Sequence, residues 1–265
     1  MAHGESVPSD VFSLEHGGDW RGGIQTAMDH FGEVGEVAVC VPGLVEGGRV
    51  ISLPGKLPGI EGVDLGAVLD VPVLVTNDAV AYGVGEAVHG AGRGHDRAVV
   101  MTIGTGVGVA VVEDGAPLGK GPLGGGILGG QVRIADPTTG PTDSSGRRGT
   151  LEALCRASSL LAEVPDAQDL PEAYDLLHAG DEAALIGFAA YRERLTVGLT
   201  LLALAHAPSA IVVGGGGAQP GLLDGVEAAL APYLWPGQTV TVRLAELGDG
   251  AALAGLGVLW RRAES

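Results

Sequence analysis

Asn77 and Asp78 are the polar pair in this chain that is best placed for acid–base chemistry. They follow an apolar stretch, residues 71–76, that predicts a strand, and they precede residues 79–88, which predict a helix. Ligands of α/β sheets bind at the carboxyl ends of strands, and a carboxylate there can take the proton of a substrate hydroxyl. Asp residues also cap helices without any catalytic role, so the position alone leaves both interpretations open.

A glycine-rich turn offers a second kind of chemistry. Residues 99–115, VVMTIGTGVGVAVVEDG, contain two apolar runs of strand-forming residues around Gly104, Thr105 and Gly106, which predicts a hairpin. Because glycine lets a backbone approach a ligand closely, the tip would present N–H groups and one hydroxyl to a phosphate. Gly-rich turns are also common where nothing binds, so the motif does not decide between a phosphate site and a tight turn.

A third glycine segment follows the apolar residues 210–213. Residues 214–217 are four consecutive glycines between this predicted strand and a predicted helix over residues 221–234. The run is compatible with a nucleotide lying against the backbone, and equally with a plain linker between a strand and a helix. By itself it is weak support for a binding site.

Composition limits the classes of function. The 265 residues suffice for one large domain or two small ones with a full hydrophobic core. The formal net charge of −17 disfavours binding to a nucleic acid backbone or to an anionic membrane surface. Cys40 and Cys155 lie in apolar segments and are predicted to be buried free thiols. The chain shows no secretion signal and no long apolar run, so we expect a cytoplasmic protein.

The order of the elements predicts an α/β fold. Strands alternate with helices, and the antiparallel hairpin makes the sheet mixed. We expect two lobes, residues 1–98 and residues 99–265, with a final helix over residues 250–262 that can return to the N-terminal lobe. Asp19 and Asp181 are predicted N-caps. Helices are predicted over residues 20–31, 63–69, 151–162, 171–179, 181–207 and 221–234.

Seven segments, taken in order, carry a family resemblance. They are VPG at 41–43, VLVTNDA at 73–79 with GE at 85–86, TIGTGVG at 102–108, DG at 114–115, GTLE at 149–152, IVVGGG at 211–216, and LGDGA at 247–251 with Gly255. Over residues 37–260 the chain resembles the ROK family (repressors, open reading frames and sugar kinases). The resemblance implies an actin-like (ribonuclease H-like) ATPase fold with two lobes and mixed sheets.

The same resemblance implies an ATP-dependent sugar kinase, in which Mg²⁺ accompanies the nucleotide. Asp78 would be the general base that takes the proton of the sugar hydroxyl, in the usual logic of phosphoryl transfer. The other implied contacts are Asn77 and Glu152 to sugar hydroxyls, Gly104, Thr105 and Gly106 to the phosphates of ATP, and Gly214, Gly215 and Gly216 to adenosine.

Two departures from the family pattern concern the N-terminal part. No Asp-x-Gly-Gly-Thr hairpin, which binds phosphate and helps to hold magnesium, stands before Val37. We therefore expect the first strands of the N-terminal lobe, and half of the phosphate clamp, to be missing. A sugar-contacting Asn in the loop after Pro54 is replaced by Lys56.

Two further departures concern the sugar motif and a zinc loop. The Glu and the His of a Gly-Glu-x-Gly-His segment are Ile127 and Gly130 here. The three cysteines of the zinc loop are Asp143, Ser145 and Thr150, which make no sulfur site, so we expect no structural zinc. Each lost polar partner removes about 1–3 kcal/mol of hydrogen bonding. The acceptor pocket should therefore be more apolar than a glucose site, which favours a less hydroxylated or modified sugar.

Two hypotheses follow. The chain is either a kinase for a sugar or sugar-like hydroxyl, or a catalytically inactive ROK-like protein that binds a metabolite or regulates a partner. A DNA-binding repressor is disfavoured, because no helix-turn-helix precedes the motifs and the charge is negative. The helix over residues 181–207 either lies in the core or supplies a homodimer face. The histidines lack metal-ligand spacing, and Glu86 is expected on a helix surface or at a lobe interface.

Overall fold

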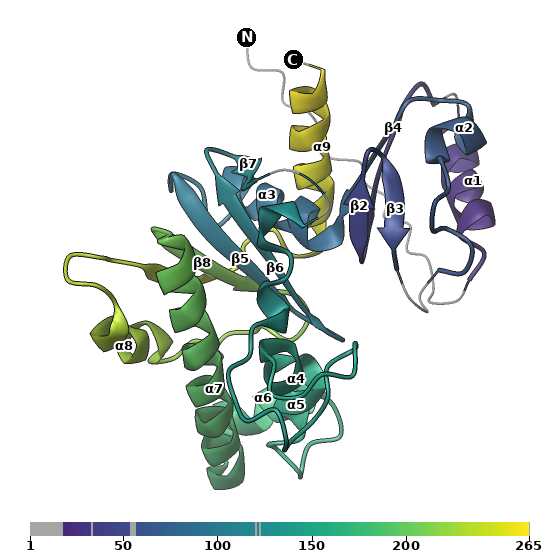
Figure 1. Cartoon of the computed structure of the whole chain (residues 1–265). Helices are drawn as coiled ribbons and strands as arrows, with labels where there is room; N and C mark the ends of the chain where they lie inside the picture. Colours follow the sequence, from purple (N-terminus) through teal and green to yellow (C-terminus); the bar gives the residue numbers. More distant parts are fainter. Residues whose placement is uncertain (1–17, 33, 54–56, 120, 122, 265) are drawn as a thin grey trace.

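The computed structural model describes residues 18–32, 34–53, 57–119, 121 and 123–264. The strands are β1 Val37–Val41, β2 Leu44–Glu46, β3 Arg49–Ser52, β4 Val73–Asn77, β5 Arg97–Ile103, β6 Val107–Glu113, β7 Ala116–Pro117, β8 Ala210–Gly214 and β9 Thr241–Leu244. In the described part, β1 pairs with β4 in parallel and β2 with β3 in antiparallel, while the other strands form one sheet of order β7-β6-β5-β8-β9 (Figure 1). The predicted mixed α/β architecture is confirmed.

Helices surround these sheets. The α-helices are α1 Trp20–Phe31, α2 Leu65–Leu69, α3 Asp78–His89, α4 Leu151–Cys155, α5 Ala157–Leu161, α6 Leu170–Ala179, α7 Glu182–His206, α8 Val226–Leu230 and α9 Ala251–Ala263. Short 3₁₀ turns are η1 Gly124–Gly126, η2 Gly129–Gln131, η3 Ala231–Tyr233 and η4 Gly248–Gly250. Figure 1 shows α1, α2, β2, β3 and β4 on one side of the five-stranded sheet, and α4–α7 in the lower part of the view.

The central strand β5 explains why this sheet is covered on both faces. Val99, Met101 and Ile103 belong to the cluster formed with α4–α7, whereas Ala98 and Val100 face Tyr82 of α3. Alternate residues of a strand point to opposite faces, so an unbroken apolar run is what a strand buried on both sides requires. The predicted hairpin of residues 99–115 is confirmed by the antiparallel pairing of β5 with β6.

The N-terminal elements have a core of their own, built on β1, β3, β4 and α1. Trp20 and Ile24 of α1 are buried in it. Asp19 caps α1 as predicted, because its carboxylate accepts a hydrogen bond from the amide of Arg21 at 3.2 Å. Cys40 departs from the prediction of burial. It is only half-buried, because the described part of β1 pairs with a single strand.

Two glycines let α9 lie directly against α3. A Cβ on Gly85 would lie 1.9 Å from the carbonyl oxygen of Ala251, and a Cβ on Gly255 would lie 1.8 Å from that of Ala81. The helix backbones therefore touch at this crossing, which no other residue type would permit. Because α9 also contacts β1, the last helix packs on elements from both parts of the chain (Figure 1).

Glu86 fixes the same junction from inside. The side chain is fully buried, and its carboxylate accepts hydrogen bonds from the amides of Ala91 at 2.9 Å, Glu246 at 3.1 Å and Leu247 at 2.7 Å. These donors belong to the turn after α3 and to the loop before α9. Glu86 is therefore an internal clamp between distant segments, and the helix-surface alternative is wrong.

Two predicted helices are interrupted. The helix predicted over residues 151–162 is split into α4 and α5 by extended backbone at Arg156 (φ −69°, ψ 163°), where the next amide, that of Ala157, donates to Gly104 O at 2.9 Å. The helix predicted over residues 221–234 is reduced to α8 and η3, because Gly225 has φ +77° and precedes the first helical residue. By contrast, α7 matches its prediction, with Asp181 as N-cap.

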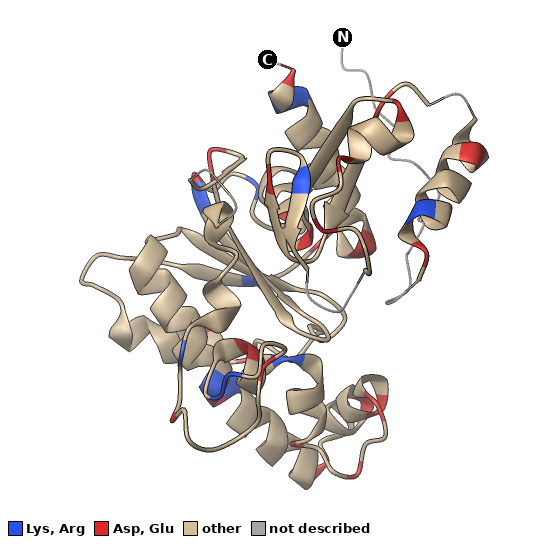
Figure 2. Cartoon of the chain, turned by 45° about the vertical axis from the view of Figure 1, so that its right-hand side comes forward, with Lys and Arg blue, Asp and Glu red and all other residues tan. Residues whose placement is uncertain are grey.

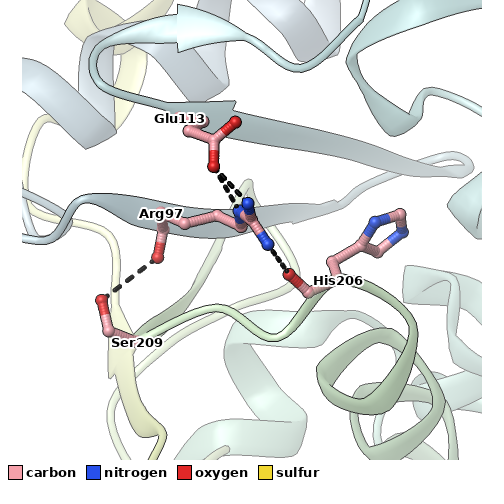
Figure 3. Close-up of polar contacts among 4 residues, drawn as sticks. All are labelled: Arg97, Glu113, His206 and Ser209. Atoms are coloured by element: carbon pink, nitrogen blue, oxygen red, sulfur yellow. Dashed lines mark hydrogen bonds and ion pairs between the residues drawn. The ribbon is translucent and has the colours of Figure 1, made fainter.

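A set of four residues joins the start of β5 and the end of β6 to the end of α7 (Figure 3). Arg97 forms an ion pair with Glu113 across the β5–β6 hairpin and donates to the carbonyl of His206 at 2.7 Å. Ser209 donates its hydroxyl to Arg97 O at 3.3 Å. Burial, together with the nearby Arg97 charge, lowers the pKa of His206.

Acidic side chains lie on both the N-terminal and the C-terminal elements, and basic ones are fewer (Figure 2). This distribution reflects the net charge of −17. Among the helices that the structure describes, none is both long enough and apolar enough to cross a membrane.

Candidate functional site

The Gly-Thr-Gly turn and the glycines of residues 214–217 lie at the same edge of the five-stranded sheet. β5 and β8 are parallel neighbours, and Thr102 pairs with Gly214 near their carboxyl ends. The amide of Gly217 donates to the carbonyl of Ile103 at 2.9 Å. Two glycine segments that are distant in the sequence are thus joined where ligands of α/β sheets bind.

The structure separates the roles of the glycines after β8. Gly215 has φ +84°, and a Cβ on it would lie 2.6 Å from the carbonyl oxygen of Ile103. A Cβ on Gly214 would lie 2.3 Å from the hydroxyl of Tyr82. Gly216, by contrast, is exposed, and a Cβ there would meet nothing within 4 Å. Gly214 and Gly215 are therefore required by the fold of the turn, while Gly216 faces open space.

The tip of the β5–β6 hairpin uses one of its own amides. Gly104 donates its N–H to the carbonyl of Gly106 at 2.9 Å, and its carbonyl accepts from Ala157 at 2.9 Å. Thr105 is exposed between them. Gly104 therefore shapes the turn with its amide already engaged, and Thr105 and Gly106 remain the candidates for contact with a phosphate.

Asp78 is the first residue of α3, and its side chain is exposed. The N-cap is Asn77, which has extended backbone and accepts a hydrogen bond from the amide of Val80 at 3.2 Å through Oδ1. The interpretation of Asp78 as the helix cap is therefore wrong by one residue. Its carboxylate lies in the first turn, where the partial positive charge of the helix stabilises an anion.

Asn77 also links α3 to the loop between β1 and β2. Its Nδ2 donates to the carbonyl of Gly43 at 2.8 Å. Gly43 has φ +121°, and a Cβ on it would lie 2.4 Å from the carbonyl oxygen of Ser52. Both ends of the Asn77 amide are thus engaged within the protein, which holds the entrance of α3 in place.

The hairpin packs against the start of α3. A Cβ on Gly108 of β6 would lie 2.9 Å from the Cβ of Ala79 and 2.5 Å from the hydroxyl of Thr102. Because Ala79 follows Asp78 directly, the absence of a side chain at Gly108 lets the start of α3, where Asp78 lies, pack closely on the hairpin.

Glu152 approaches the turn from the other side. It lies in the first turn of α4 and is only 5% exposed. Its Oε1 accepts a hydrogen bond from the amide of Ser144 at 2.7 Å, and its Oε2 lies 3.2 Å from the position that a Cβ on Gly106 would take. The structure therefore brings Glu152 to the predicted phosphate turn, although the two lie in different parts of the sequence.

A cleft of about 190 Å³ opens next to β4 and η1. Strands β2 and β4 line it with both polar and apolar residues, and α3, β7 and the residue after η1 add apolar ones. The lining includes Glu46, Thr76, Asn77, Val80, Pro117 and Ile127. The cleft thus combines apolar walls with a few polar groups.

Comparisons with known proteins place this geometry in a family. The ROK family model matches residues 23–263. The chain belongs to the ROK family. It is 31% identical to a glucokinase of Thermotoga maritima over 62% of this chain and 57% of that protein, and 30% identical to the N-acetylgalactosamine kinase AgaK of Shewanella sp. over 89% and 81%. A xylose repressor of Bacillus spizizenii is 25% identical over 85% and 60%. The chain thus spans less than two thirds of that glucokinase and of that repressor.

Solved ROK structures have the same fold. A ROK family glucokinase from Streptomyces griseus in complex with glucose and AMPPNP has 25% identity and a TM-score of 0.76, with 91% of this chain and 87% of that chain covered. A ROK hexokinase from Thermus thermophilus has 27% identity and a TM-score of 0.70, with 86% and 79% covered. The predicted actin-like ATPase fold is confirmed.

The structure gives a reason for two departures from the ROK sugar motif. A Cβ on Gly130 would lie 2.4 Å from the carbonyl oxygen of Val107, so no larger residue fits there without a shift of β6. Ile127 packs on an apolar cluster that includes Val80 and Val84. The segment that holds a Glu and a His in the family pattern is here fitted tightly against the sheet and α3.

The ROK zinc loop is replaced by a hydrogen-bonded cluster. Asp143 is 4% exposed and accepts hydrogen bonds from the hydroxyls of Ser145 at 2.8 Å and Thr150 at 3.0 Å. Of the three residues that stand where the family cysteines align, Asp143 therefore contacts both of the others. In the part of the chain that the structure describes, no group of three or more His, Cys, Asp or Glu side chains is placed to share a metal ion. Lys56 lies outside the described residues.

Sequence reasoning missed the contacts that hold Glu152 and Asn77. An Asp followed by Ser two positions later, as in Asp143-Ser144-Ser145, is a signal for a turn in which the Asp side chain bonds the backbone. The turn at Asp143 could therefore have been predicted from the sequence. Nothing local indicates that Ser144 faces Glu152, or that Asn77 reaches Gly43, because these pairs form only in the folded chain.

Burial raises the pKa of both thiols. Cys155, which is buried as predicted, has a pKa of about 12, and Cys40 has a pKa of about 11, to which the charge of Asp78 also contributes. Both stay protonated at neutral pH, so neither is a nucleophile in this site.

Proposed function

We propose that this ROK family chain is an ATP-dependent kinase that phosphorylates a hydroxyl of a sugar or sugar-like molecule. One observation carries the proposal. Asp78 begins α3 beside the β5–β6 hairpin, and Glu152 approaches the Gly-Thr-Gly turn of that hairpin from α4. A candidate base, a phosphate turn and a buried acidic hydrogen-bond acceptor thereby converge.

In this proposal Asp78 is the general base. Its carboxylate is exposed and lies in the first turn of α3, near the positive end of the helix dipole. The residue would accept the proton of the acceptor hydroxyl and align its oxygen for attack. Asn77 would contact a hydroxyl of the acceptor. Its side chain also holds the start of α3 in place through its hydrogen bond to Gly43.

The sheet edge that carries the Gly-Thr-Gly turn and residues 214–217 leaves room for a nucleotide, because glycines have no side chains to fill the space. A Cβ on Gly104 or on Gly216 would meet nothing within 4 Å, and Thr105 is exposed between the two strands. Thr105 and Gly106 would hold phosphates through backbone and hydroxyl donors, and Gly214–Gly216 would lie along adenosine. The chemistry that bound ATP with Mg²⁺ supplies is the phosphoryl group and part of its charge neutralisation.

The acceptor would lie toward the 190 Å³ cleft and Glu152. A buried carboxylate with one oxygen on the Ser144 amide can use the other for a sugar hydroxyl. Ile127, Val80 and Pro117 make the wall apolar, which supports the preference for a modified or less hydroxylated sugar. This fits the range of acceptors among the relatives, from the glucokinases to the N-acetylgalactosamine kinase.

Turnover tests the proposal. ADP release from ATP and Mg²⁺ is measured for the full chain with glucose, N-acetylgalactosamine and a wider panel of sugars. Asp78→Asn should lower kcat by roughly 10²–10⁴-fold, because it removes the base and keeps the shape. Asp181→Asn, which keeps a good N-cap at the remote α7, should leave kcat unchanged. Turnover no higher than that of Asp78→Asn with every sugar would reject kinase activity.

A second candidate is a non-catalytic ROK protein that binds a metabolite and regulates a partner. The match to the xylose repressor and the replacement of the motif Glu and His by Ile127 and Gly130 favour it. Calorimetry with xylose and the same sugar panel, with and without ATP, separates the two. Sugar binding without any turnover favours regulation, and absence of binding to sugar or nucleotide removes both.

We also propose the division into an N-terminal lobe of residues 1–98 and a C-terminal lobe of residues 99–265. Separate apolar clusters support it, one around Trp20, Val41 and Val75 and another around β5, β8 and α7. The contact of α9 with both α3 and β1 supports the return of the last helix to the N-terminal lobe.

A homodimer through α7 completes the proposal. Ile186, Val197 and Leu204 on this helix are 64%, 43% and 49% exposed, and Val197 lines an apolar groove of about 610 Å³ together with Leu201 and Tyr233. Apolar patches of this kind mark association surfaces. Light scattering after size exclusion should give twice the chain mass, and Val197→Glu should give the monomer mass. A wild-type monomer at about 100 µM, far above typical Kd values, would reject the dimer.

A further inference from the structure

The carboxylate of Asp143 accepts four hydrogen bonds from its own loop. Its Oδ1 accepts from the amide of Ser145 at 2.9 Å, the hydroxyl of Ser145 at 2.8 Å and the amide of Arg147 at 2.8 Å, and its Oδ2 accepts from the hydroxyl of Thr150 at 3.0 Å. The side chain is 4% exposed. A single buried carboxylate thus closes the loop of residues 143–150 onto itself.

This loop leads directly to Glu152. Thr150 is the N-cap of α4 and accepts from the amide of Ala153 at 3.2 Å, so Asp143 is joined to the first turn of the helix that carries Glu152. Ser144, the residue next to Asp143, donates its amide to Glu152 Oε1 at 2.7 Å. The position of the Glu152 carboxylate is therefore set by a loop whose shape depends on Asp143.

The backbone of the loop follows the same pattern. The amide of Asp143 donates to the carbonyl of Arg147 at 2.8 Å, and the amide of Gly146 donates to the carbonyl of Asp143 at 3.0 Å. These two bonds form a tight turn, and the side chain of Asp143 anchors that turn on Thr150. Loss of the carboxylate should therefore loosen the amide that donates to Glu152.

The hydrogen bonds that the Asp143 carboxylate accepts favour its ionised form. Burial by itself would raise the pKa of Asp143, but hydrogen bonds from Ser145, Arg147 and Thr150 outweigh it and lower the pKa below the usual range. Asp143 is thus a negative acceptor at neutral pH.

We propose that Asp143 is a positioning residue, which fixes the Glu152 carboxylate against the Gly-Thr-Gly turn through the loop of residues 143–150 and thereby sets the affinity for the sugar. This inference rests on the proposed function for its consequence on sugar binding. It goes beyond it in assigning a role to a residue that touches neither sugar nor nucleotide. In this role Asp143 acts on Glu152 through the loop, in particular through Ser144 and Thr150.

The test compares Asp143→Ala with a matched control, Asp136→Ala. Asp136 makes the same kind of turn in the same segment, since its Oδ1 accepts from the amide and the hydroxyl of Thr138 at 2.7 Å and 2.6 Å, but it is exposed. Asp143→Ala should raise the sugar KM roughly tenfold or more and leave the ATP KM within about twofold, because a hydrogen bond to a charged group is lost. Asp136→Ala should change neither value. Asp143→Asn keeps the Oδ1 acceptor and should recover most of the sugar affinity.

A second measurement does not depend on activity. Hydrogen exchange at the Ser144 amide should be slow in the wild-type chain and should become fast in Asp143→Ala and in Glu152→Ala, but not in Asp136→Ala. Unchanged exchange in Asp143→Ala would overturn the proposal whether or not the chain is a kinase. Faster exchange with an unchanged sugar KM would also overturn it, because the order that Asp143 gives the loop would then not set the affinity for the sugar. A wild-type chain without turnover would reject the proposed function, and exchange would still decide whether Asp143 positions Glu152.

Discussion

The two sides of the candidate site are built by different means. On the proposed nucleotide side, backbone groups hold the glycine segments in place, as in the contacts of Gly217 with Ile103 and of Gly104 with Ala157. On the proposed acceptor side, the carboxylates of Glu152 and Asp143 hold the loop of residues 143–150 in place. The proposed nucleotide side depends on glycines that have no side chain, and the proposed acceptor side depends on charged carboxylates and their hydrogen-bond donors. A Cβ added to a glycine should therefore disrupt the first side, and loss of a carboxylate should disrupt the second.

The largest effect on stability is expected on the nucleotide side. Gly215→Ala would place a Cβ in a left-handed backbone conformation and 2.6 Å from the carbonyl oxygen of Ile103. We expect a loss of about 2–4 kcal/mol in the free energy of unfolding, from the strained φ together with the overlap. Urea denaturation followed by circular dichroism measures it.

Gly216→Ala is the matched control on the same turn. Its Cβ would meet nothing within 4 Å, so stability should change by less than about 0.5 kcal/mol. If Gly216 faces adenosine as proposed, this variant should still weaken ATP binding. Equal stabilities for the two alanine variants would contradict the separation of roles in this turn.

A smaller effect is expected where the acceptor side meets the sheet. Gly130→Ala would place a Cβ 2.4 Å from the carbonyl oxygen of Val107, and β6 must shift to admit it. The cost should be about 1–3 kcal/mol, in the range of overpacked cores. Gly250→Ala, in ordinary helical backbone with open space around its Cβ, serves as the control in the same denaturation experiment. A fully stable Gly130→Ala would show that steric fit does not explain the glycine at this position.

The fold of the proposed nucleotide side was predictable from the sequence because its signals are local. A run of Val residues on either side of Gly104 and Gly106 can form little other than a tight hairpin, and the structure has it as β5 and β6. Gly180 likewise ends α6 and Asp181 begins α7 as predicted, because a left-handed C-terminal glycine and an N-cap oxygen each act within one turn of helix.

The acceptor side was less predictable because its contacts are long-range. Asn77 rather than Asp78 caps α3, and the same side chain also holds Gly43, a partner 34 positions away. Arg156 interrupts a segment with a good helical pattern, because the next amide is taken by the carbonyl of Gly104. Local preference yields to tertiary contacts at both positions, and no pattern of neighbouring residues reports this.

The smallest effect concerns pH and separates the buried carboxylate of the acceptor side from an exposed one. Hydrogen bonds hold the pKa of Asp143 below its usual value against the opposing effect of burial, so this group contributes stability that is fully present above its unfolded pKa of about 3.9 and is lost as pH falls through the folded pKa. Wild type should have a higher Tm than Asp143→Asn at pH 7, and the gap should shrink below about pH 4 as Asp143 takes up its proton. The pKa of Asp136 is lowered by its hydrogen bonds to Thr138, but its side chain is exposed, so Asp136→Asn should leave the acid limb of Tm against pH almost unchanged. A gap for Asp143→Asn that stays constant down to pH 2 would mean that shape, and not charge, is what this carboxylate supplies to the loop.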